Sequence, residues 1–342
     1  MLYSERIKKE LNTYKEITDV HDLPESHNYM ISNFVTPIMK KTFGFSSFPE
    51  MIEKYVNQIK TAKDESKINI LSLGSGNCDT EIDLALTSSI KANIFCYELN
   101  SDMLERGKRL ALEKLGKDNK FNFVQCDINK LKLQQEMDIV IANHSLHHFV
   151  ELEHIFSEVS NNMTEKSYFV INDMIGRNGH MFWNNTLEII NLIWNMLPKE
   201  LKYCHQWKKY HFIREQWDFS KDSFEGIRSQ DILPLLDKTF KFKDFAPFWA
   251  ITNRFIDRGY GHNFNLDNQH HKAILDMLGA YDDYFLSNKL LKPTQMLATV
   301  MKKDADISDY KYMYFENPND AYTLDDDKVW DYFYRLPGGI KH

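Results

Sequence analysis

The stretch KINILSLGSGNCDTEIDLA, residues 67–85, decides the fold of this chain. It opens with an apolar run typical of a buried strand, which ends at Leu73. Gly74 and Gly76 then allow a sharp turn and a close approach of the backbone to a ligand above the strand end. Asp79 begins a helix. A strand that passes through a glycine turn into a helix N-terminus is how open α/β sheets build a nucleotide site.

Strand-like and helix-like segments alternate from this stretch onward. The pattern predicts strands at 68–73, 93–98, 121–125, 137–142 and 168–172, with helices at 79–86, 102–115 and 152–162. After residue 228 it predicts helices at 230–239 and 268–286 and strands at 240–248 and 295–301. Strands that alternate with helices of this length imply right-handed crossovers and a parallel sheet covered on both faces.

The segments outside this alternation suggest how the chain is divided. Residues 1–64 are expected to form an N-terminal helical cap, and residues 65–302 an α/β domain with a helical insertion at about 174–228 after the fifth strand. Residues 303–342 form an acidic, aromatic tail. A disordered tail rarely holds so many aromatic side chains, so we expect it to pack on the domain or on a second copy in a homodimer.

Composition restricts the classes of partner. Among its 342 residues the chain has a net charge of −7, whereas binding to a nucleic-acid backbone requires a basic face. The four cysteines have no metal-ligand spacing. No signal peptide and no apolar run long enough to span a bilayer is visible, so we expect a cytoplasmic protein without a membrane partner.

Polar side chains follow three of the predicted strands. Glu98 ends the second strand about 20 residues after the glycine turn, where a carboxylate can accept hydrogen bonds from a ribose diol. Asp127 follows the third strand, where a carboxylate can accept from an adenine amino group. Asn143 and His144 follow the fourth. Open α/β sheets bind ligands at these strand ends, so the ordered set indicates one nucleotide site.

These motifs resemble those of class I S-adenosylmethionine-dependent methyltransferases. LSLGSGNCD resembles the glycine motif of that family, CYELN its ribose motif and QCDINKL its adenine motif, while ANHSLHHF resembles the segment after its fourth strand. KDSFEGIRSQDILPLL and NRFIDRGYGHNFN resemble features of a bacterial subgroup that methylates small molecules. One departure is Cys78, which stands where many members carry a third glycine and is small enough for close packing.

The resemblance implies a seven-stranded, Rossmann-like sheet with an antiparallel last strand, and S-adenosylmethionine as cofactor. It implies transfer of the sulfonium methyl group, by in-line displacement, to an O, N or S atom of a small polar metabolite. The residues expected to bind the cofactor are Leu73, Gly74, Ser75, Gly76, Asn77, Glu98, Leu99, Asp127, Ile128, Asn143 and His144.

Catalytic and substrate-binding residues are expected in the loops that follow. His148 and Asp173 are the catalytic candidates, the imidazole as a general base if the acceptor must lose a proton. His144 and His147 have a spacing that could hold a metal, but packing or a cofactor contact is favoured and no metal is expected. The residues expected to bind substrate are His147, Arg177, Trp217, Arg228, Trp249 and Arg258.

Two alternatives come from other functional classes. A non-catalytic scaffold that binds S-adenosylmethionine would keep the same cofactor motifs. A nicotinamide-dependent dehydrogenase would share the first strand and the acidic residue, but no Gly-x-Gly-x-x-Gly motif is present, because Asn77, Cys78 and Asp79 follow Gly76. Methylation of nucleic-acid bases is disfavoured, because Asn143 is not followed by the Pro-Pro-aromatic sequence that grips a flipped base.

Overall fold

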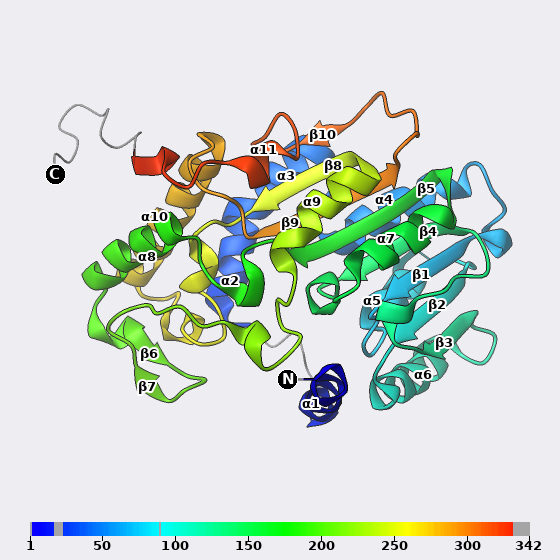
Figure 1. Cartoon of the computed structure of the whole chain (residues 1–342), viewed down its shortest axis with the longest axis horizontal. Coiled ribbons are helices and arrows are strands. Elements are labelled where there is room, and N and C mark those ends of the chain that lie inside the picture. The colour runs from blue at the N-terminus through cyan, green and yellow to red at the C-terminus, as the bar shows by residue number, and fades with distance from the viewer. Residues whose placement is uncertain (1, 17–22, 89, 331–342) are drawn as a thin grey trace.

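A computed structural model describes residues 2–16, 23–88 and 90–330. Its centre is one mixed sheet with the strand order β10-β8-β9-β5-β4-β1-β2-β3 (Figure 1). The strands are β1 (Asn69–Leu73), β2 (Asn93–Glu98), β3 (Phe121–Gln125), β4 (Met137–Asn143), β5 (Met163–Met174), β8 (Phe240–Phe248), β9 (Gln295–Lys302) and β10 (Lys311–Tyr312). β9 is antiparallel to both of its neighbours, and all other pairs are parallel.

The sheet has eight strands, not the seven that were expected. The additional strand, β10, is contributed by the tail, where Lys311 and Tyr312 pair with Asp244 and Phe245 of β8. A strand of two residues has no alternation of its own, so no local pattern could predict it.

Helices cover both faces of the sheet. α4 (Phe48–Lys60), α5 (Asp79–Ser88) and α6 (Ser101–Leu115) pack in series on one face, and α7 (Leu152–Asn161) and α9 (Ser229–Thr239) pack together on the other. Figure 1 shows α7 and α9 in front of the strands and α4 behind them. Parallel strands buried on both faces are rich in apolar residues, as in β1, where Ile70, Leu71 and Leu73 are all fully buried.

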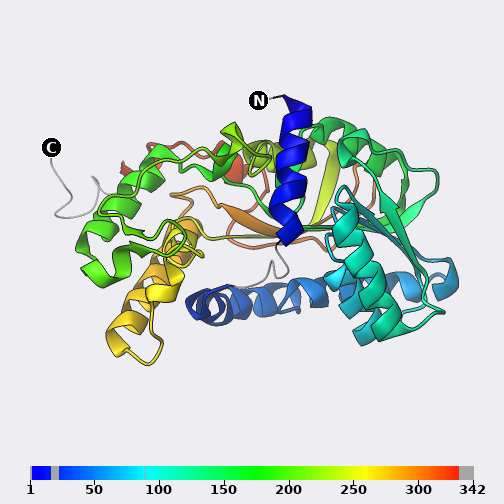
Figure 2. The same cartoon turned by 90° about the horizontal axis from the view of Figure 1, so that it is seen from below.

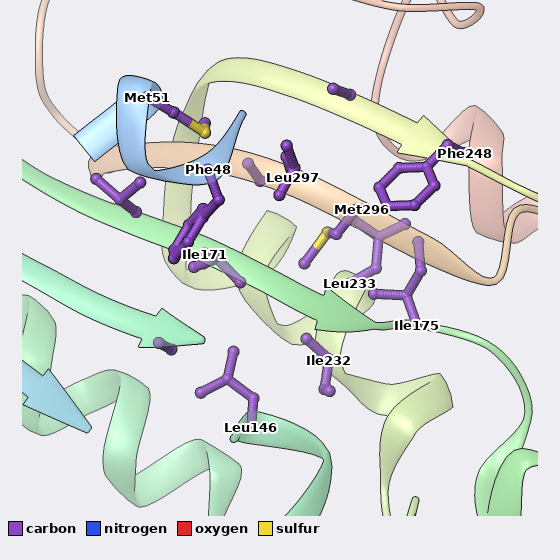
Figure 3. Close-up of a cluster of buried hydrophobic side chains, with 14 of the residues drawn as sticks. Phe48, Met51, Leu146, Ile171, Ile175, Ile232, Leu233, Phe248, Met296 and Leu297 are labelled. Carbon is purple, nitrogen blue, oxygen red and sulfur yellow. The ribbon is translucent and has the colours of Figure 1, made fainter. Parts of the chain in front are cut away.

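The hydrophobic core lies on both sides of β5 and β9. Figure 3 shows Phe48 and Met51 of α4 on one side of these strands, and Ile232 and Leu233 of α9 on the other. Successive side chains of a strand point to opposite faces, so consecutive residues of β9 contribute to the core on both sides of the sheet.

The N-terminal helices form two separate groups. α2 (Glu25–Met30), a π-helical turn (Ile31–Val35) and α3 (Thr36–Phe43) lead into α4. α1 (Tyr3–Glu16) stands at a steep angle to that layer (Figure 2). None of the α1 side chains described, those of residues 3–13, is buried, so contacts at its surface hold this helix in place.

Residues between β5 and α9 hold α8 (Asn184–Met196) and a small hairpin of β6 (Tyr203–Cys204) and β7 (Lys209–Tyr210). α10 (Gln269–Ser287) lies near them, on the side of the molecule away from β2 and β3 (Figure 1). The described part of the tail contains α11 (Asp320–Thr323) and buries Met313, Phe315 and Val329. The part of the tail from residue 331 lies outside the described residues. No helix within the described ranges is both long and apolar enough to cross a membrane.

Candidate active site

The glycine turn after β1 adopts a conformation that requires glycine. Gly74 has φ +68°, and a Cβ at that position would lie 2.8 Å from Ser145 Cβ. Its amide donates to the carbonyl of Tyr97 on β2 at 2.8 Å, as does that of Ser75 at 3.1 Å. The turn is therefore held flat against the ends of β2 and β4, which leaves its upper surface open to a ligand.

Cys78 occupies the position of the missing third glycine. It is fully buried and has φ +60°, a left-handed conformation uncommon for residues with a Cβ. Close packing at this point is provided instead by Gly107 of α6, where an added Cβ would lie 2.7 Å from the Asn77 carbonyl oxygen and 3.0 Å from Cys78 Sγ. Gly107 on α6 therefore permits the close contact with the turn that a third glycine at position 78 would otherwise permit.

Glu98 closes the turn from the end of β2. Its Oε2 accepts from the amide of Gly76 at 3.0 Å, and its Oε1 accepts from the amide of Asn100 at 2.8 Å. Burial raises the pKa of Glu98, against the lowering effect of these two backbone donors. Each oxygen has a second lone pair, which leaves the carboxylate able to accept from the hydroxyls of a ribose.

Asp127, at the end of β3, is covered by α1. The Tyr3 hydroxyl donates to its carboxylate oxygens, at 2.8 and 2.9 Å, and the Asn129 amide donates to Oδ1 at 3.1 Å. Arg6 donates to backbone carbonyls of residues 220–223, and Glu10 Oε1 lies 2.9 Å from His148 Nδ1. α1 thus bridges the adenine motif, the segment after β4 and the loop before α9.

A cavity of about 1060 Å³ lies beneath α1, at the carboxyl ends of the parallel strands. Every residue expected to bind the cofactor lines it except Leu73, whose side chain is fully buried in the sheet. Four residues expected to act on or bind the substrate also line it: His147, His148, Trp249 and Arg258. The cavity therefore joins the expected cofactor site to part of the expected substrate site.

One wall of the cavity is formed by His147, His148, His180 and Glu225, which we call the histidine cluster, and the buried Asp173 lies behind His147. His147 Nδ1 lies 2.5 Å from Asp173 Oδ1, and His180 Nε2 lies 2.8 Å from Glu225 Oε1. Glu225 also lies 3.6 Å from His147 Nε2 and 3.5 Å from His148 Nε2. Three imidazoles thus surround a single carboxylate.

Asp173 does not reach the cavity. Its side chain is fully buried, and its oxygens accept from the amides of Ser145, Leu146 and Met174, at 2.7–2.9 Å, as well as facing His147. Burial would raise the pKa of Asp173, but His147 and the backbone donors lower it overall. This geometry suits a residue that orients His147 better than one that touches a substrate.

Charge is distributed unevenly over the histidine cluster. Burial would lower the pKa of His147, but the carboxylates of Asp173 and Glu225 raise it to about 10. Burial lowers the pKa of His180, despite its hydrogen bond to Glu225. Burial would raise the pKa of Glu225, but the surrounding imidazoles hold it well below its ordinary value. At neutral pH the cluster contains a charged His147, a neutral His180 and an ionised Glu225.

The part of the cavity next to the histidine cluster carries cationic and aromatic groups. Arg254 and Arg258 line it together with His27 and Trp249, whose rings meet edge to face at 5.0 Å. Burial lowers the pKa of Arg254 to about 10, so it remains protonated at neutral pH. Burial lowers the pKa of His27 to about 4, with a further contribution from Arg258, so His27 is neutral.

Three of the expected substrate-binding residues do not line the cavity. Arg228 pairs with Glu153 and Asp231 at 2.6 and 2.8 Å, which fixes the start of α9 to α7. Arg177 donates to the carbonyl of Phe182 at 3.0 Å. Trp217 is half exposed and lines a smaller pocket in the segment between β5 and α9.

His27, His180 and Arg254 were not expected in the site, and Glu225 lies in the segment KDSFEGIRSQDILPLL, which was quoted only for its resemblance. They come from α2, from a 3₁₀ turn at Asn178–His180, from another at Thr252–Arg254 and from the loop before α9. No spacing in the sequence connects these segments. Only the folded chain brings them to one wall.

Comparison with known proteins fits this arrangement of sheet, turn and cavity. The sequence profile of a family described as a methyltransferase domain matches residues 64–232. The chain carries a class I S-adenosylmethionine-dependent methyltransferase domain. This methyltransferase is an enzyme, and S-adenosylmethionine is its cofactor. The matched residues run from just before β1 into α9, and so include the glycine turn, Glu98, Asp127 and the whole histidine cluster.

Solved structures similar to the methyltransferase are distant. Geranyl diphosphate C-methyltransferase from Streptomyces coelicolor A3(2), solved with Mg²⁺, geranyl diphosphate and S-adenosyl-L-homocysteine, is 11% identical over 88% of this chain and 100% of that one, with a TM-score of 0.46. The StiE O-MT segment 961–1257 is 12% identical over 82% of this chain and 80% of that one, with a TM-score of 0.41. No curated protein matches the chain significantly. These scores are too low for the substrates of those proteins to bear on this methyltransferase.

Proposed function

We propose that the methyltransferase transfers the sulfonium methyl group of S-adenosylmethionine to an O, N or S atom of a small polar metabolite that carries an anionic group. One observation carries the proposal: the cofactor motifs, the histidine cluster and two arginines line a single cavity. A volume of about 1060 Å³ is at the upper end of the range for small-molecule sites, which leaves room for a cofactor and a small acceptor together.

The anionic group of the metabolite is inferred from Arg254 and Arg258. Arg254 donates to the carbonyl of His180, but among the described residues its Nε has no hydrogen-bond partner. Its guanidinium also lies 4.5 Å from the centre of the Phe182 ring, which holds it in place. A fixed, mostly buried guanidinium with an unsatisfied donor is stabilised by a carboxylate or phosphate group.

In this proposal, His148 is the general base for acceptors that must lose a proton, and Asp173 acts by positioning His147. Transfer of a methyl group from a sulfonium disperses positive charge, so alignment and exclusion of water account for most of the catalysis. Glu98 and the glycine turn hold the cofactor for this alignment.

The test is a methyl-release assay with S-adenosylmethionine labelled in its methyl group. A low-molecular-weight cell extract is separated into anionic, neutral and cationic pools, and label is followed in each pool and in macromolecules. We expect label in the anionic pool, and a loss of cofactor affinity and of labelling in Glu98→Ala but not in Glu113→Ala, an exposed position on α6. Cofactor binding without transfer to any pool would favour a scaffold, and label only in macromolecules would contradict a small-molecule acceptor.

A further inference from the structure

The histidine cluster has the composition of a metal site. The side-chain ligand atoms of His147, His180 and Glu225 all lie within 4.8 Å of one another. Two imidazoles and one carboxylate are a donor set that proteins use for Zn²⁺ and Fe²⁺, and one that Mg²⁺ and Ca²⁺ disfavour.

One distance between these ligand atoms fits a shared metal ion better than it fits a hydrogen bond. His147 Nε2 and Glu225 Oε1 lie 3.6 Å apart, beyond a good hydrogen bond. Two ligand atoms that each lie about 2.0–2.2 Å from one ion are separated by roughly 3.0–3.6 Å. His180 Nε2 and Glu225 Oε1 lie closer together, at 2.8 Å. If a metal ion replaced the proton between these two atoms, they would need to separate by only about a few tenths of an ångström.

His147 also has the partner that metal-bound histidines usually have. Its Nδ1 faces the buried Asp173 carboxylate at 2.5 Å, which directs Nε2 toward Glu225 and the cavity. Carboxylate–histidine–metal arrangements fix the ring orientation and raise the basicity of the ligand. The three amide donors to Asp173 hold this carboxylate in turn.

Backbone hydrogen bonds fasten the three ligand-bearing segments together. The amide of Ile227 donates to the carbonyl of His147 at 3.0 Å, and the amide of Gly179 donates to the carbonyl of Gly226 at 2.7 Å. Gly226 has φ +64°, and an added Cβ there would lie 2.9 Å from the amide nitrogen of His180. The loops therefore pack at a distance that only glycine permits, and the ligand set does not depend on the ion to assemble.

The site is open on the side of the cavity. The side chains of His147 and His180 are almost buried, while that of Glu225 is 35% exposed, and all three line the cavity. Three protein ligands with further positions open to a pocket are typical of catalytic rather than structural metal sites.

The geometry points to a divalent transition-metal site formed by His147, His180 and Glu225, whose open positions hold a hydroxyl oxygen of the acceptor. The binding of the ion stands on these residues alone, whereas its role rests on the methyl transfer proposed above. An ion there would favour ionisation of the hydroxyl. The O–H proton passes to His148, and the oxygen then attacks the methyl carbon. The C–S bond breaks, its electron pair stays on sulfur, and S-adenosylhomocysteine leaves.

Co²⁺ is the probe for this site, because its visible absorption reports the ligands and their number. The full chain is freed of metal with a chelator and titrated with Co²⁺, and then Zn²⁺ is added as a competitor. We expect saturation at one Co²⁺ per chain and displacement of Co²⁺ by Zn²⁺. A wild-type chain that gives no saturable spectrum would overturn the proposal.

Variants test whether the visible absorption of bound Co²⁺ arises from binding to these three ligands. His180→Ala and Glu225→Gln should each weaken Co²⁺ binding by about 100-fold, at least as much as loss of an outer partner costs. His270→Ala removes an exposed histidine on α10 and should bind as the wild type does. Equal affinity in all three variants would also overturn the site. Glu225→Gln changes one atom of a partly exposed side chain, so it keeps the test valid if His180→Ala does not fold.

Cofactor affinity and methyl transfer are measured on the same samples. Absence of Co²⁺ binding together with intact methyl transfer would overturn the metal site and leave the proposed function standing. A bound ion without methyl transfer to any metabolite pool would overturn the proposed function and leave the metal site standing.

Discussion

At the scale of single residues, Gly74 is the position in the candidate cofactor site where a side chain would be strained and would clash. Its φ of +68° strains any residue with a Cβ, and that Cβ would lie 2.8 Å from Ser145 Cβ, which cannot rotate away. We expect Gly74→Ala to lower the free energy of unfolding by on the order of 3 kcal/mol and to weaken S-adenosylmethionine binding. Urea unfolding and calorimetric titration of the cofactor measure the two effects.

Gly44 provides the matched control. It has φ +82° at the end of α3, but no atom lies within 4 Å of the position of an added Cβ. Gly44→Ala should therefore cost only the strain of the left-handed conformation, about 1 kcal/mol, and leave cofactor affinity unchanged. If both variants lost cofactor affinity equally, the role given to the turn at Gly74 would be wrong.

Glu81, on the first turn of α5, predicts a pH dependence of stability. Its side chain is buried, its Oε1 accepts from the Ser72 hydroxyl at 2.6 Å, and burial raises its pKa from 4.5 to about 7. Between these two values the folded chain keeps a proton that the unfolded chain has lost. The free energy of unfolding should therefore fall as the pH rises from 4.5 through 7, by up to about 3 kcal/mol from this group.

Glu81→Gln removes this contribution. As the pH is raised from 5 to 8, we expect the free energy of unfolding of Glu81→Gln to rise relative to that of the wild type. Urea unfolding at both pH values measures the difference. The exposed Glu113→Gln on α6 should follow the wild type throughout. Parallel pH profiles for Glu81→Gln and the wild type would show that Glu81 is ionised in the folded chain.

At the scale of elements, α1 is the helix most free to move. It has no buried side chain among residues 3–13, and its contacts to Asp127, to His148 and to the loop before α9 all lie at the mouth of the cavity. We expect Tyr3→Phe, which removes the hydroxyl bound to Asp127, to speed dissociation of S-adenosylmethionine by about fivefold, the equivalent of one hydrogen bond. Stopped-flow fluorescence measures the rate.

Thermal unfolding checks whether Tyr3→Phe acts on cofactor release alone. The Tyr3 hydroxyl lies at the surface, on a helix with no buried side chain among residues 3–13, so its loss should leave the unfolding midpoint almost unchanged. Tyr310→Phe, another exposed tyrosine, should alter neither quantity. An unchanged dissociation rate in Tyr3→Phe would mean that α1 does not cover the bound cofactor.

The elements themselves could largely be predicted from the sequence, since burial of whole strands and amphipathic helices leaves a local pattern. β2, β3 and β8 have the predicted bounds, whereas β5 begins at Met163 instead of residue 168. The polar residues Thr164, Glu165 and Lys166 break the apolar pattern there, yet the backbone continues as a strand. Within this extension only Met163 pairs with β4, opposite Met137, and the register then passes to Tyr168 across an irregularity.

The candidate site, like the elements, could be predicted only in part from the sequence. The residues expected to bind the cofactor follow strands in a fixed order, so the position of Glu98 and Asp127 at the cavity could be predicted from spacing. The histidine cluster could be identified only in part, because His180 and Glu225 are single polar residues 45 positions apart with no shared period. Their meeting depends on the packing of two loops through Gly179 and Gly226, which is a tertiary feature.

At the scale of the whole molecule, β10 has a consequence for how the methyltransferase behaves at high concentration. Without it, β8 would be the outermost strand and would present unpaired backbone groups, which act as a template for strands of other molecules. The tail covers this edge through the strand pairs Lys311–Asp244 and Tyr312–Phe245, a hydrogen bond from the Met313 amide to the Phe245 carbonyl, and an ion pair between Lys243 and Asp309.

A chain that ends at residue 303 should therefore keep its sheet but aggregate. We expect light scattering to rise with protein concentration for the truncated chain and to stay level for the full one. A truncated chain that remained monodisperse would assign the tail to another role. We therefore expect residues 309–313 to prevent β8 from pairing with strands of other molecules, an effect on association that is independent of methyl transfer.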